Sequence, residues 1–325
     1  MNINIWLTKK CNLQCTYCYE GVTKETESMS REICNQVIAY IKKLDGEVNV
    51  RFHGGEPLLE YSNLQYLYKC LNATGKVKTF GVTTNGTLLS DEKIEFLTSA
   101  MDDFSISIDG TREVHNRNRK NAYGKGSYDE VYKIIPKVLK NKPYARARMT
   151  VTPDTVSNLY ESVENVIILG FKVVAIAVDI FNQMWNEKNK NDYMAAIKLL
   201  NDKYGKQDDI HISVIEKNGI RKLASCGGGK NSVHIGTDGT CYPCGFSVGL
   251  KEFAIGNIET GIKLEMLEEI ERMSHVSNPE CEGCTVYDFC SGTRCKIINK
   301  IVCGTCNTPP IATCMDMNVR AKVLY

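Results

Sequence analysis

Apolar residues in the first 180 positions follow two alternating patterns. Short apolar runs predict strands, and between them apolar residues recur at spacings of three and four, which predicts amphipathic helices. Since six strand–helix units in succession predict parallel strands with crossover helices, and a closed barrel of this kind has eight units, we expect an open or partial barrel. The predicted strands cover residues 2–7, 48–53, 78–84, 104–108, 145–151 and 172–179. The predicted helices cover residues 31–44, 64–72, 91–100, 128–139, 156–169 and 192–204.

The pattern changes near Cys226, where Gly, Cys and short turns become frequent. Only residues 264–273 predict a helix in this part of the chain. So short and irregular a region is not expected to build a good apolar core, and small regions of this kind usually need a metal or disulfide staple. We therefore predict two domains, residues 1–215 and residues 216–325.

Charge and hydropathy argue against two classes of partner. The chain has 40 Lys and Arg against 38 Asp and Glu, a net charge of +2, so it lacks the concentrated basic surface that nucleic-acid binding needs. Its longest apolar stretches, such as residues 173–180, are too short to span a bilayer. The N-terminus does not show the charged segment followed by an apolar segment that is typical of a secretory signal peptide. We expect a cytoplasmic protein that binds neither nucleic acid nor membrane.

The 15 cysteines are unusual in number and in distribution. Three lie within residues 11–18, and ten lie between Cys226 and Cys314. In a reducing compartment, thiols clustered in this way indicate metal binding rather than disulfides. Cys34 and Cys70 fall in predicted helices, where we expect them to be buried as small apolar side chains.

Cys11, Cys15 and Cys18 follow the first strand with Cx3Cx2C spacing. Three thiolates on one loop can hold three irons of a four-iron cluster and leave the fourth iron open, whereas structural zinc, the alternative, usually takes four ligands in two pairs. Polar residues end the next three strands, which predicts one ligand pocket beside the loop. In that pocket the carboxylate of Glu56 is a candidate anchor for an ammonium group.

These motifs together resemble the radical SAM superfamily: the cysteine loop with Tyr17 before its last cysteine, Gly-Gly-Glu-Pro at residues 54–57 and Ser-Ile-Asp-Gly at residues 107–110. The resemblance implies a [4Fe–4S] cluster on Cys11, Cys15 and Cys18 that binds S-adenosylmethionine (SAM) and cleaves it reductively. The products are methionine and a 5′-deoxyadenosyl radical, which abstracts hydrogen from the substrate. The implied SAM contacts are Tyr17 near the adenine, Gly54, Gly55 and Glu56 at the methionine amino group, Asn85 and Ser107 at the strand ends, and Arg119 or Arg148 at the carboxylate.

The late cysteines resemble a SPASM domain, an extension of some radical SAM enzymes that holds two auxiliary [4Fe–4S] clusters. The resemblance assigns Cys226, Cys244 and Cys295 to auxiliary cluster I, with Cys241 as a candidate fourth ligand, and Cys281, Cys284, Cys290 and Cys314 to auxiliary cluster II. Cys303 and Cys306 are extra and are further candidates for the fourth position. If no cysteine takes it, one iron is open to a substrate thiolate.

By themselves, the late cysteine pairs permit zinc as readily as iron–sulfur. With the resemblance, the expected fold is α/β, a partial (β/α)6 TIM-type barrel with a C-terminal Cys-rich SPASM domain. The expected cofactors are SAM and three [4Fe–4S] clusters.

The resemblance also implies an enzyme that modifies a peptide or protein in an anaerobic setting. Our first prediction is maturation of a ribosomally made, post-translationally modified peptide (RiPP) by thioether or carbon–carbon cross-linking. A flavodoxin or ferredoxin would supply low-potential electrons. Because Cys11 directly follows the first strand, an N-terminal leader-binding domain has no room, and a separate leader-peptide-binding protein is a candidate partner. The alternatives are an anaerobic sulfatase-maturating (formylglycine-generating) enzyme and a non-catalytic metal-binding or electron-transfer protein.

Overall fold

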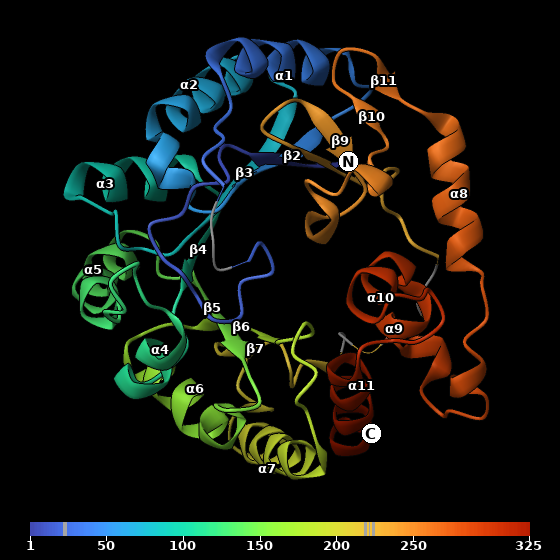
Figure 1. Cartoon of the computed structure of the whole chain (residues 1–325). Helices are drawn as coiled ribbons and strands as arrows, with labels where there is room; N and C mark the ends of the chain where they lie inside the picture. The colour runs from blue at the N-terminus through green and yellow to red at the C-terminus, as the bar shows by residue number, and fades with distance from the viewer. Residues whose placement is uncertain (22–24, 218–219, 221, 223–224) are drawn as a thin grey trace.

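The computed structural model describes residues 1–21, 25–217, 220, 222 and 225–325. Six parallel strands line the inside of a curved wall and helices cover its outside (Figure 1). This is the predicted partial barrel, which is therefore confirmed. The strands are β1 (Asn2–Trp6), β2 (Val48–His53), β3 (Val77–Thr84), β4 (Asp103–Ser107), β5 (Arg146–Val151) and β6 (Val173–Val178). The helices are α1 (Arg31–Lys43), α2 (Tyr61–Asn72), α3 (Asp91–Ala100), α4 (Arg112–Asn118), α5 (Tyr128–Asn141), α6 (Leu159–Ile168) and α7 (Glu187–Tyr204).

Alternation along β2 separates an apolar outer face from a polar face toward the lumen. In β2, Val50 and Phe52 are buried in the core, whereas Arg51 and His53, which alternate with them, are only half-buried. Because successive side chains of a strand point to opposite faces, the core lies between strands and helices, and polar groups are left for the lumen. Of the two cysteines expected in this core, Cys34 is fully buried, and Cys70 is half-buried and packs against it.

The C-terminal region continues the sheet of the barrel. After β7 (His211–Ile212), which pairs with β6, the strand β8 (Ser232–Ile235) pairs in parallel with β1. Among the described residues the sheet has 11 strands in the order β11-β10-β9-β8-β1-β2-β3-β4-β5-β6-β7. The added strands are β9 (Thr240–Tyr242), β10 (Gly256–Asn257) and β11 (Gly261–Ile262).

Helices of the C-terminal region close the open side of the barrel (Figure 1). They are α8 (Leu264–Ser274), α9 (Ser291–Arg294), α10 (Lys296–Cys303) and α11 (Ile311–Leu324). The 3-10 turns of the barrel are η1 (Pro57–Glu60) and η2 (Val156–Asn158). Those of the C-terminal region are η4 (Gly245–Ser247), η5 (Lys251–Phe253), η6 (Pro279–Cys281) and η7 (Tyr287–Phe289). α11 packs against α7 and β6. Its Ala312, Met315 and Val319 are buried in the same core as the barrel. This region therefore packs its apolar residues into the core of the barrel.

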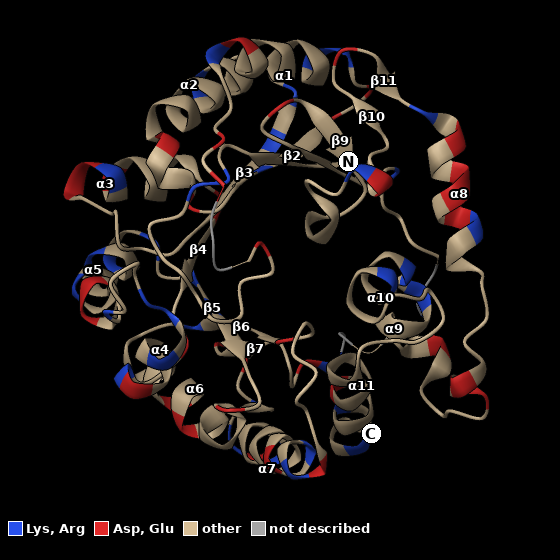
Figure 2. Cartoon of the chain, in the orientation of Figure 1, with Lys and Arg blue, Asp and Glu red and all other residues tan. Residues whose placement is uncertain are grey.

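Charged side chains of both signs are interspersed along the outer helices (Figure 2). No helix in the described residues has the length and apolarity to cross a membrane.

Candidate active site

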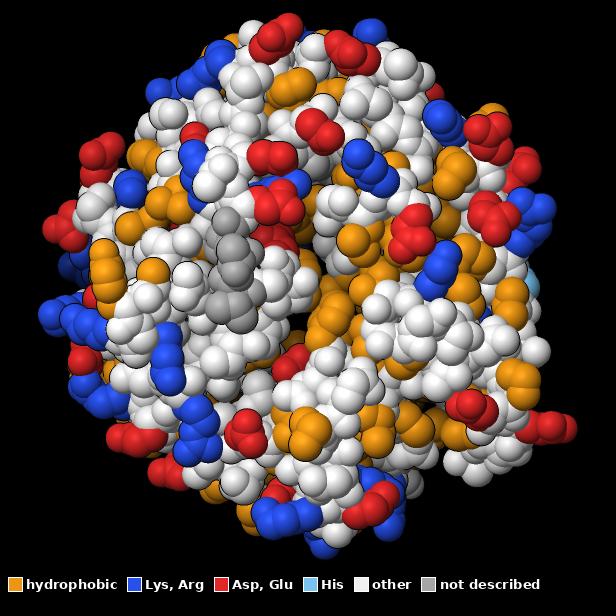
Figure 3. Space-filling view, viewed as in Figure 1, with side chains coloured by type: hydrophobic (Ala, Val, Ile, Leu, Met, Phe, Trp, Pro, Cys, Tyr) orange, Lys and Arg blue, Asp and Glu red, His pale blue; other side chains and the backbone are white. Residues whose placement is uncertain are grey.

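A cavity of about 660 Å³ lies at the C-terminal ends of the barrel strands. Figure 3 shows a hollow at the centre of this face, partly rimmed by hydrophobic side chains. The loop after β1 and the ends of β2 to β6 supply most of the wall. α11 completes the wall with Thr313, Asp316 and Arg320, which share one helix face because they are spaced at three and four residues. The C-terminal end of a parallel barrel is where its active sites form.

Cys11, Cys15 and Cys18 all line this cavity. The loop that carries them is tied to the segment after α4. The amide of Gln14 donates to the carbonyl of Lys120 at 2.6 Å, and the amide of Thr16 donates to the carbonyl of Asn118 at 3.0 Å. The three sulfurs are therefore presented by a loop whose backbone is fixed at two points.

Hydrogen-bond donors approach two of these sulfurs. The amide of Leu13 lies 3.4 Å from Cys11 Sγ, and Nδ2 of Asn85 lies 3.9 Å from it. Nη1 of Arg119 lies 4.0 Å from Cys15 Sγ. Donors and positive charge favour the thiolate over the thiol, and the thiolate is the form that binds metal. The chemistry of this loop therefore fits the predicted cluster.

The Gly-Gly-Glu-Pro segment holds the loop after β1 by backbone contact. A Cβ on Gly54, whose φ is +151°, would lie 2.5 Å from the carbonyl oxygen of Thr8, and a Cβ on Gly55 would overlap the carbonyl of Lys10. The absence of side chains lets the amides of Gly55 and Glu56 donate to those carbonyls, both at 2.8 Å. The two glycines thus allow close approach of two chain segments.

The carboxylate of Glu56 is completely buried and is occupied by internal donors. It accepts hydrogen bonds from the Thr84 hydroxyl at 2.7 Å, the Asn85 amide at 2.7 Å and the Leu58 amide at 3.1 Å. Burial raises its pKa, and these hydrogen bonds oppose that rise. These three hydrogen bonds fix the carboxylate at the wall of the cavity, where Glu56 is one of the lining residues, and a carboxylate has about four acceptor sites. Its role as anchor of an ammonium group stays a prediction.

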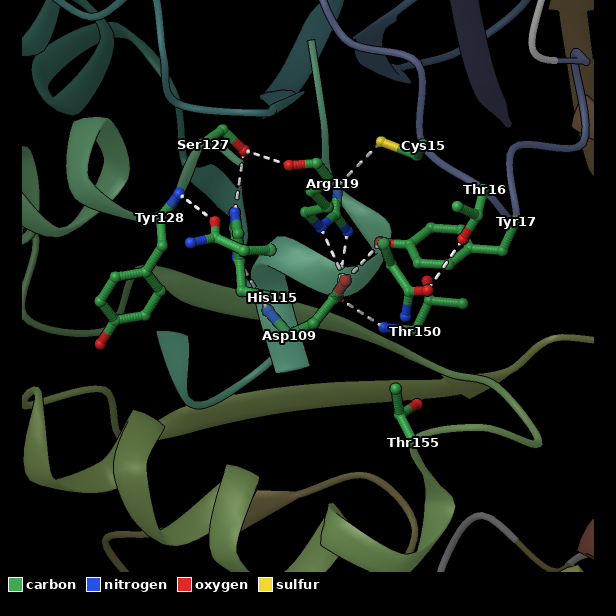
Figure 4. A network of polar contacts seen from close by, with 12 residues as sticks. Cys15, Thr16, Tyr17, Asp109, His115, Arg119, Ser127, Tyr128, Thr150 and Thr155 are labelled. Carbon is green, nitrogen blue, oxygen red and sulfur yellow. Dashed lines mark hydrogen bonds and ion pairs between the residues drawn. The ribbon is translucent and has the colours of Figure 1, made fainter. Parts of the chain in front are cut away.

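Asp109 is the centre of a polar network beside the cysteine loop (Figure 4). The side chain is 1% exposed and accepts hydrogen bonds from Nε and Nη2 of Arg119 at 2.9 and 3.2 Å. It also accepts from the Tyr17 hydroxyl at 2.5 Å and the Thr150 amide at 3.0 Å. The sequence singled out the segment that contains Asp109 but not this residue. Its position after a buried strand, followed by glycine, was the available signal.

This network gives Arg119 and Tyr17 internal partners. The guanidinium of Arg119 forms a buried ion pair with Asp109 and lies 5.3 Å from the centre of the Tyr17 ring. Arg119 was one of two candidates for the SAM carboxylate. Its charge is already compensated by Asp109, and its Nη1 lies toward Cys15 Sγ.

His115 supports the network in its neutral form. The Asp109 amide donates to Nδ1 at 3.4 Å, and Nε2 pairs with the Ser127 hydroxyl at 3.0 Å. Burial lowers the pKa of His115 to about 4, and the charge of Arg119 also lowers it. Since the unfolded chain takes up a proton near pH 6.5 and the folded chain does not, stability is lost as the pH falls below that value.

We therefore expect the urea concentration at the midpoint of unfolding to decrease as the pH is lowered from about 7 to about 5. His115→Gln should reduce the size of this fall, because one neutral buried imidazole is removed. The remaining decrease should come from His53 and His234, because burial lowers their pKa values to about 3 and about 4. An unchanged pH dependence in His115→Gln would contradict this account.

Ser107 and Arg148 face each other across adjacent strands at the cavity. They are directly paired in the β4–β5 ladder and both line the cavity. Within the described residues, the guanidinium of Arg148 has no hydrogen-bond or ion-pair partner. Burial lowers its pKa, and so do the charges of Arg146 and Arg51. An anion is therefore the ligand that this position favours.

Residues 6–166 match the radical SAM superfamily. This segment is a radical SAM domain. The chain is also 26% identical to a cysteine-type anaerobic sulfatase-maturating enzyme of Clostridium perfringens, over 88% of this chain and 86% of that protein. It is 27% identical to the antilisterial bacteriocin subtilosin biosynthesis protein AlbA of Bacillus subtilis, over 78% of this chain and 56% of that protein.

Solved structures share the fold of the radical SAM domain and of the C-terminal region together. Native anSMEcpe with bound AdoMet and Kp18Cys peptide has a TM-score of 0.81 at 20% identity, covering 99% of this chain and 96% of that one. Streptococcus suis SuiB bound to precursor peptide SuiA has a TM-score of 0.70 at 15% identity, covering 96% and 75%. These likenesses show the radical SAM/SPASM fold, which confirms the predicted fold class.

The late cysteines influence one another's pKa values within two groups. Burial raises the pKa of the Cys295 thiol to about 12, and the charges of Cys244 and Cys226 add to that rise. The second group is Cys281, Cys284, Cys290 and Cys314, whose thiols act on one another in the same way. Each group is the set that the resemblance assigns to one auxiliary cluster.

Cys241 lies apart from both groups. It is fully buried in the core, on β9, and the charge that acts on it comes from Asp238. Cys303 and Cys306 lie at the other end of α10 from Cys295. In the described parts of the chain, no three Cys, His, Asp or Glu side chains lie close enough to hold one metal ion. Each ligand set therefore stays a prediction.

Proposed function

We propose that this radical SAM protein modifies a peptide that enters the barrel from the side of the C-terminal region. The main support is a second cavity of about 260 Å³ beside the first. Both cavities are lined by Tyr19, Glu20, Phe181 and Phe246. Together they give a route from the surface past three aromatic rings to the cysteine loop, which suits an extended chain better than a compact metabolite.

The three rings come from separate segments and contact one another. Tyr19 follows the cysteine loop, Phe181 follows β6, and Phe246 lies in η4 of the C-terminal region. The ring of Tyr19 lies 5.1 Å from that of Phe246 and 6.3 Å from that of Phe181, and the last two are 5.6 Å apart. Rings at these distances pack favourably, so they join the C-terminal region to the barrel at the mouth of the cavity.

The relatives support a peptide substrate. One solved neighbour is named with a bound Kp18Cys peptide and another with its precursor peptide SuiA. When bound, SAM and its cluster supply a radical that takes a hydrogen atom from the substrate. In this chain Cys11, Cys15 and Cys18 would hold that cluster, and the neighbouring polar groups would hold SAM.

Arg148 and Ser107 are the groups that we assign to the SAM carboxylate. A guanidinium–carboxylate hydrogen bond contributes about 1.5–3 kcal/mol. We expect Arg148→Met to weaken SAM binding by about 10- to 100-fold. Equilibrium dialysis of SAM against the anaerobically reconstituted protein measures this.

Arg146→Met is the matched control for Arg148→Met. Arg146 lies on the same strand and also points to the lumen, but it is paired with Asp103 at 2.8 Å. We expect that control to bind SAM like the wild type. Unchanged binding in Arg148→Met would overturn the assignment.

For the bond that is formed, we place sulfur-to-carbon thioether formation first and carbon–carbon cross-linking second. Cys226, Cys244 and Cys295 form a group of three, and Cys241 points into the core instead of joining them. A cluster on three cysteines keeps one iron for an outside ligand, and a substrate thiolate is a ligand that iron accepts.

Sulfatase maturation is the second candidate, supported by the relative of that name that aligns over 88% of this chain. Mass spectrometry of a cysteine-containing peptide after turnover distinguishes the two reactions. A thioether removes two hydrogens and blocks thiol alkylation, whereas formylglycine loses the sulfur and leaves an aldehyde that a hydrazide captures. Release of 5′-deoxyadenosine with no change in any peptide offered together with its leader would contradict both.

A further inference from the structure

A fully buried lysine lies between the two groups of late cysteines. Lys296 directly follows Cys295 at the start of α10 and is 2% exposed, among the largest completely buried side chains of the described residues. A buried ammonium is costly unless an anion or several acceptors surround it, because it has lost its hydration. The environment of Lys296 should therefore contain a negative charge.

The described residues do not provide a carboxylate for that purpose. Nζ of Lys296 donates to Oδ1 of Asn278 at 2.5 Å, and none of the ion pairs of the described residues includes Lys296. Asn278 is itself 3% exposed and is fixed by donation from its Nδ2 to the carbonyl of Asn307. A neutral amide satisfies one of three N–H donors and leaves the charge uncompensated.

Asn278, which accepts from Lys296, also holds Cys281, because its backbone carbonyl accepts a hydrogen bond from the Cys281 amide at 2.9 Å. Burial lowers the pKa of Lys296, as does the charge of Arg294, whereas thiolates at Cys306 and Cys281 would raise it. Cys281 belongs to the second group of cysteines, and the turn that carries Cys306 is held over α10 by Nδ2 of Asn299, which donates to the Cys306 carbonyl at 3.1 Å. As thiols these sulfurs are neutral. The sulfur of Cys281 carries charge once it binds a metal centre as a thiolate.

We propose that Lys296 is the buried counter-charge of the metal centre at Cys281 and raises the reduction potential of that centre. The inference rests on the proposed auxiliary cluster. A fixed positive charge stabilises the reduced cluster, which carries one more electron, over the oxidised cluster. Lys296 is thus a positioning residue that acts through the centre and does not touch the substrate.

The test is a redox titration of the reconstituted full chain, followed by electron paramagnetic resonance, with iron and sulfide measured per chain. The signal of the centre is identified by its loss in Cys281→Ala. In Lys296→Met we expect full iron content and at least a tenfold shift of the reduction equilibrium toward the oxidised cluster, about 59 mV for one electron. Lys296→Arg, which keeps the charge, should stay close to the wild type.

Lys300→Met is the matched control, since Lys300 lies one turn further along α10, is exposed and pairs with Glu252 at 3.5 Å. It should leave the potential unchanged. If Lys296→Met loses iron while Lys296→Arg keeps it, the positive charge is required for the centre, which also supports the proposal. Loss of iron in both variants, or full iron with an unshifted potential in Lys296→Met, overturns it. Wild-type iron of only about four per chain would overturn the auxiliary clusters as well.

Discussion

Replacing Cys11, Cys15 and Cys18 together by alanine should abolish SAM cleavage and remove about four irons per chain, one cluster of this type. With two auxiliary clusters the wild type should hold about 12, so about eight should remain. The three cysteines line the main cavity, and Asn85 and Arg119 approach the sulfurs of Cys11 and Cys15. We expect both losses because alanine has no thiolate to bind iron. Iron and sulfide analysis after anaerobic reconstitution and an assay of 5′-deoxyadenosine measure both effects.

The double variant Cys34→Ala, Cys70→Ala is the control for the loss of thiols. Both residues belong to the helix layer of the core, away from the cavity. This control should keep the full iron content and the SAM cleavage. A wild-type total near four irons, with zinc making up the rest, would contradict the auxiliary clusters and favour a zinc scaffold.

Asp109→Asn should lower the free energy of unfolding by about 3–5 kcal/mol, because the buried guanidinium of Arg119 loses the carboxylate with which it pairs in the described residues. Asp109 also holds the Tyr17 hydroxyl and the Thr150 amide, so one substitution disturbs three segments. Urea unfolding of the variant and the wild type at neutral pH measures the difference.

The matched control is Asp209→Asn. Asp209 is 63% exposed at its side chain and lies 3.6 Å from Lys172. Exposed pairs of this kind contribute about 0–1 kcal/mol. A loss of less than 1 kcal/mol in Asp109→Asn would mean that the Arg119 charge finds another partner, and the network in Figure 4 would then not be a stabilising centre.

The strands of the barrel could be predicted to within one residue at each end, because buried parallel strands form short apolar runs bounded by polar residues. The shorter helices could not. α4 spans seven residues, which is too short to show a period of 3.6. α11 was missed because it packs between α7, β6 and α9, so its apolar residues do not form a single stripe.

The cysteine loop and the residues at strand ends could be located from the sequence, since a parallel barrel brings strand ends together. Their partners could not. The Tyr17–Asp109 hydrogen bond joins residues 92 positions apart, and the contact of Glu56 with Asn85 depends on how β2 and β3 pair. The pairing of Lys296 with a neutral amide is likewise visible only after folding.

The parallel pairing of β8 with β1 has a consequence for the order of folding. Asn4 on β1 and His234 on β8 are 230 positions apart. At about 5–20 residues per second, a ribosome completes β8 on the order of ten seconds or more after β1 has been made. Such non-local pairing is slow to form. The wall behind the cysteine loop is therefore completed late in folding, after most of the chain has left the ribosome.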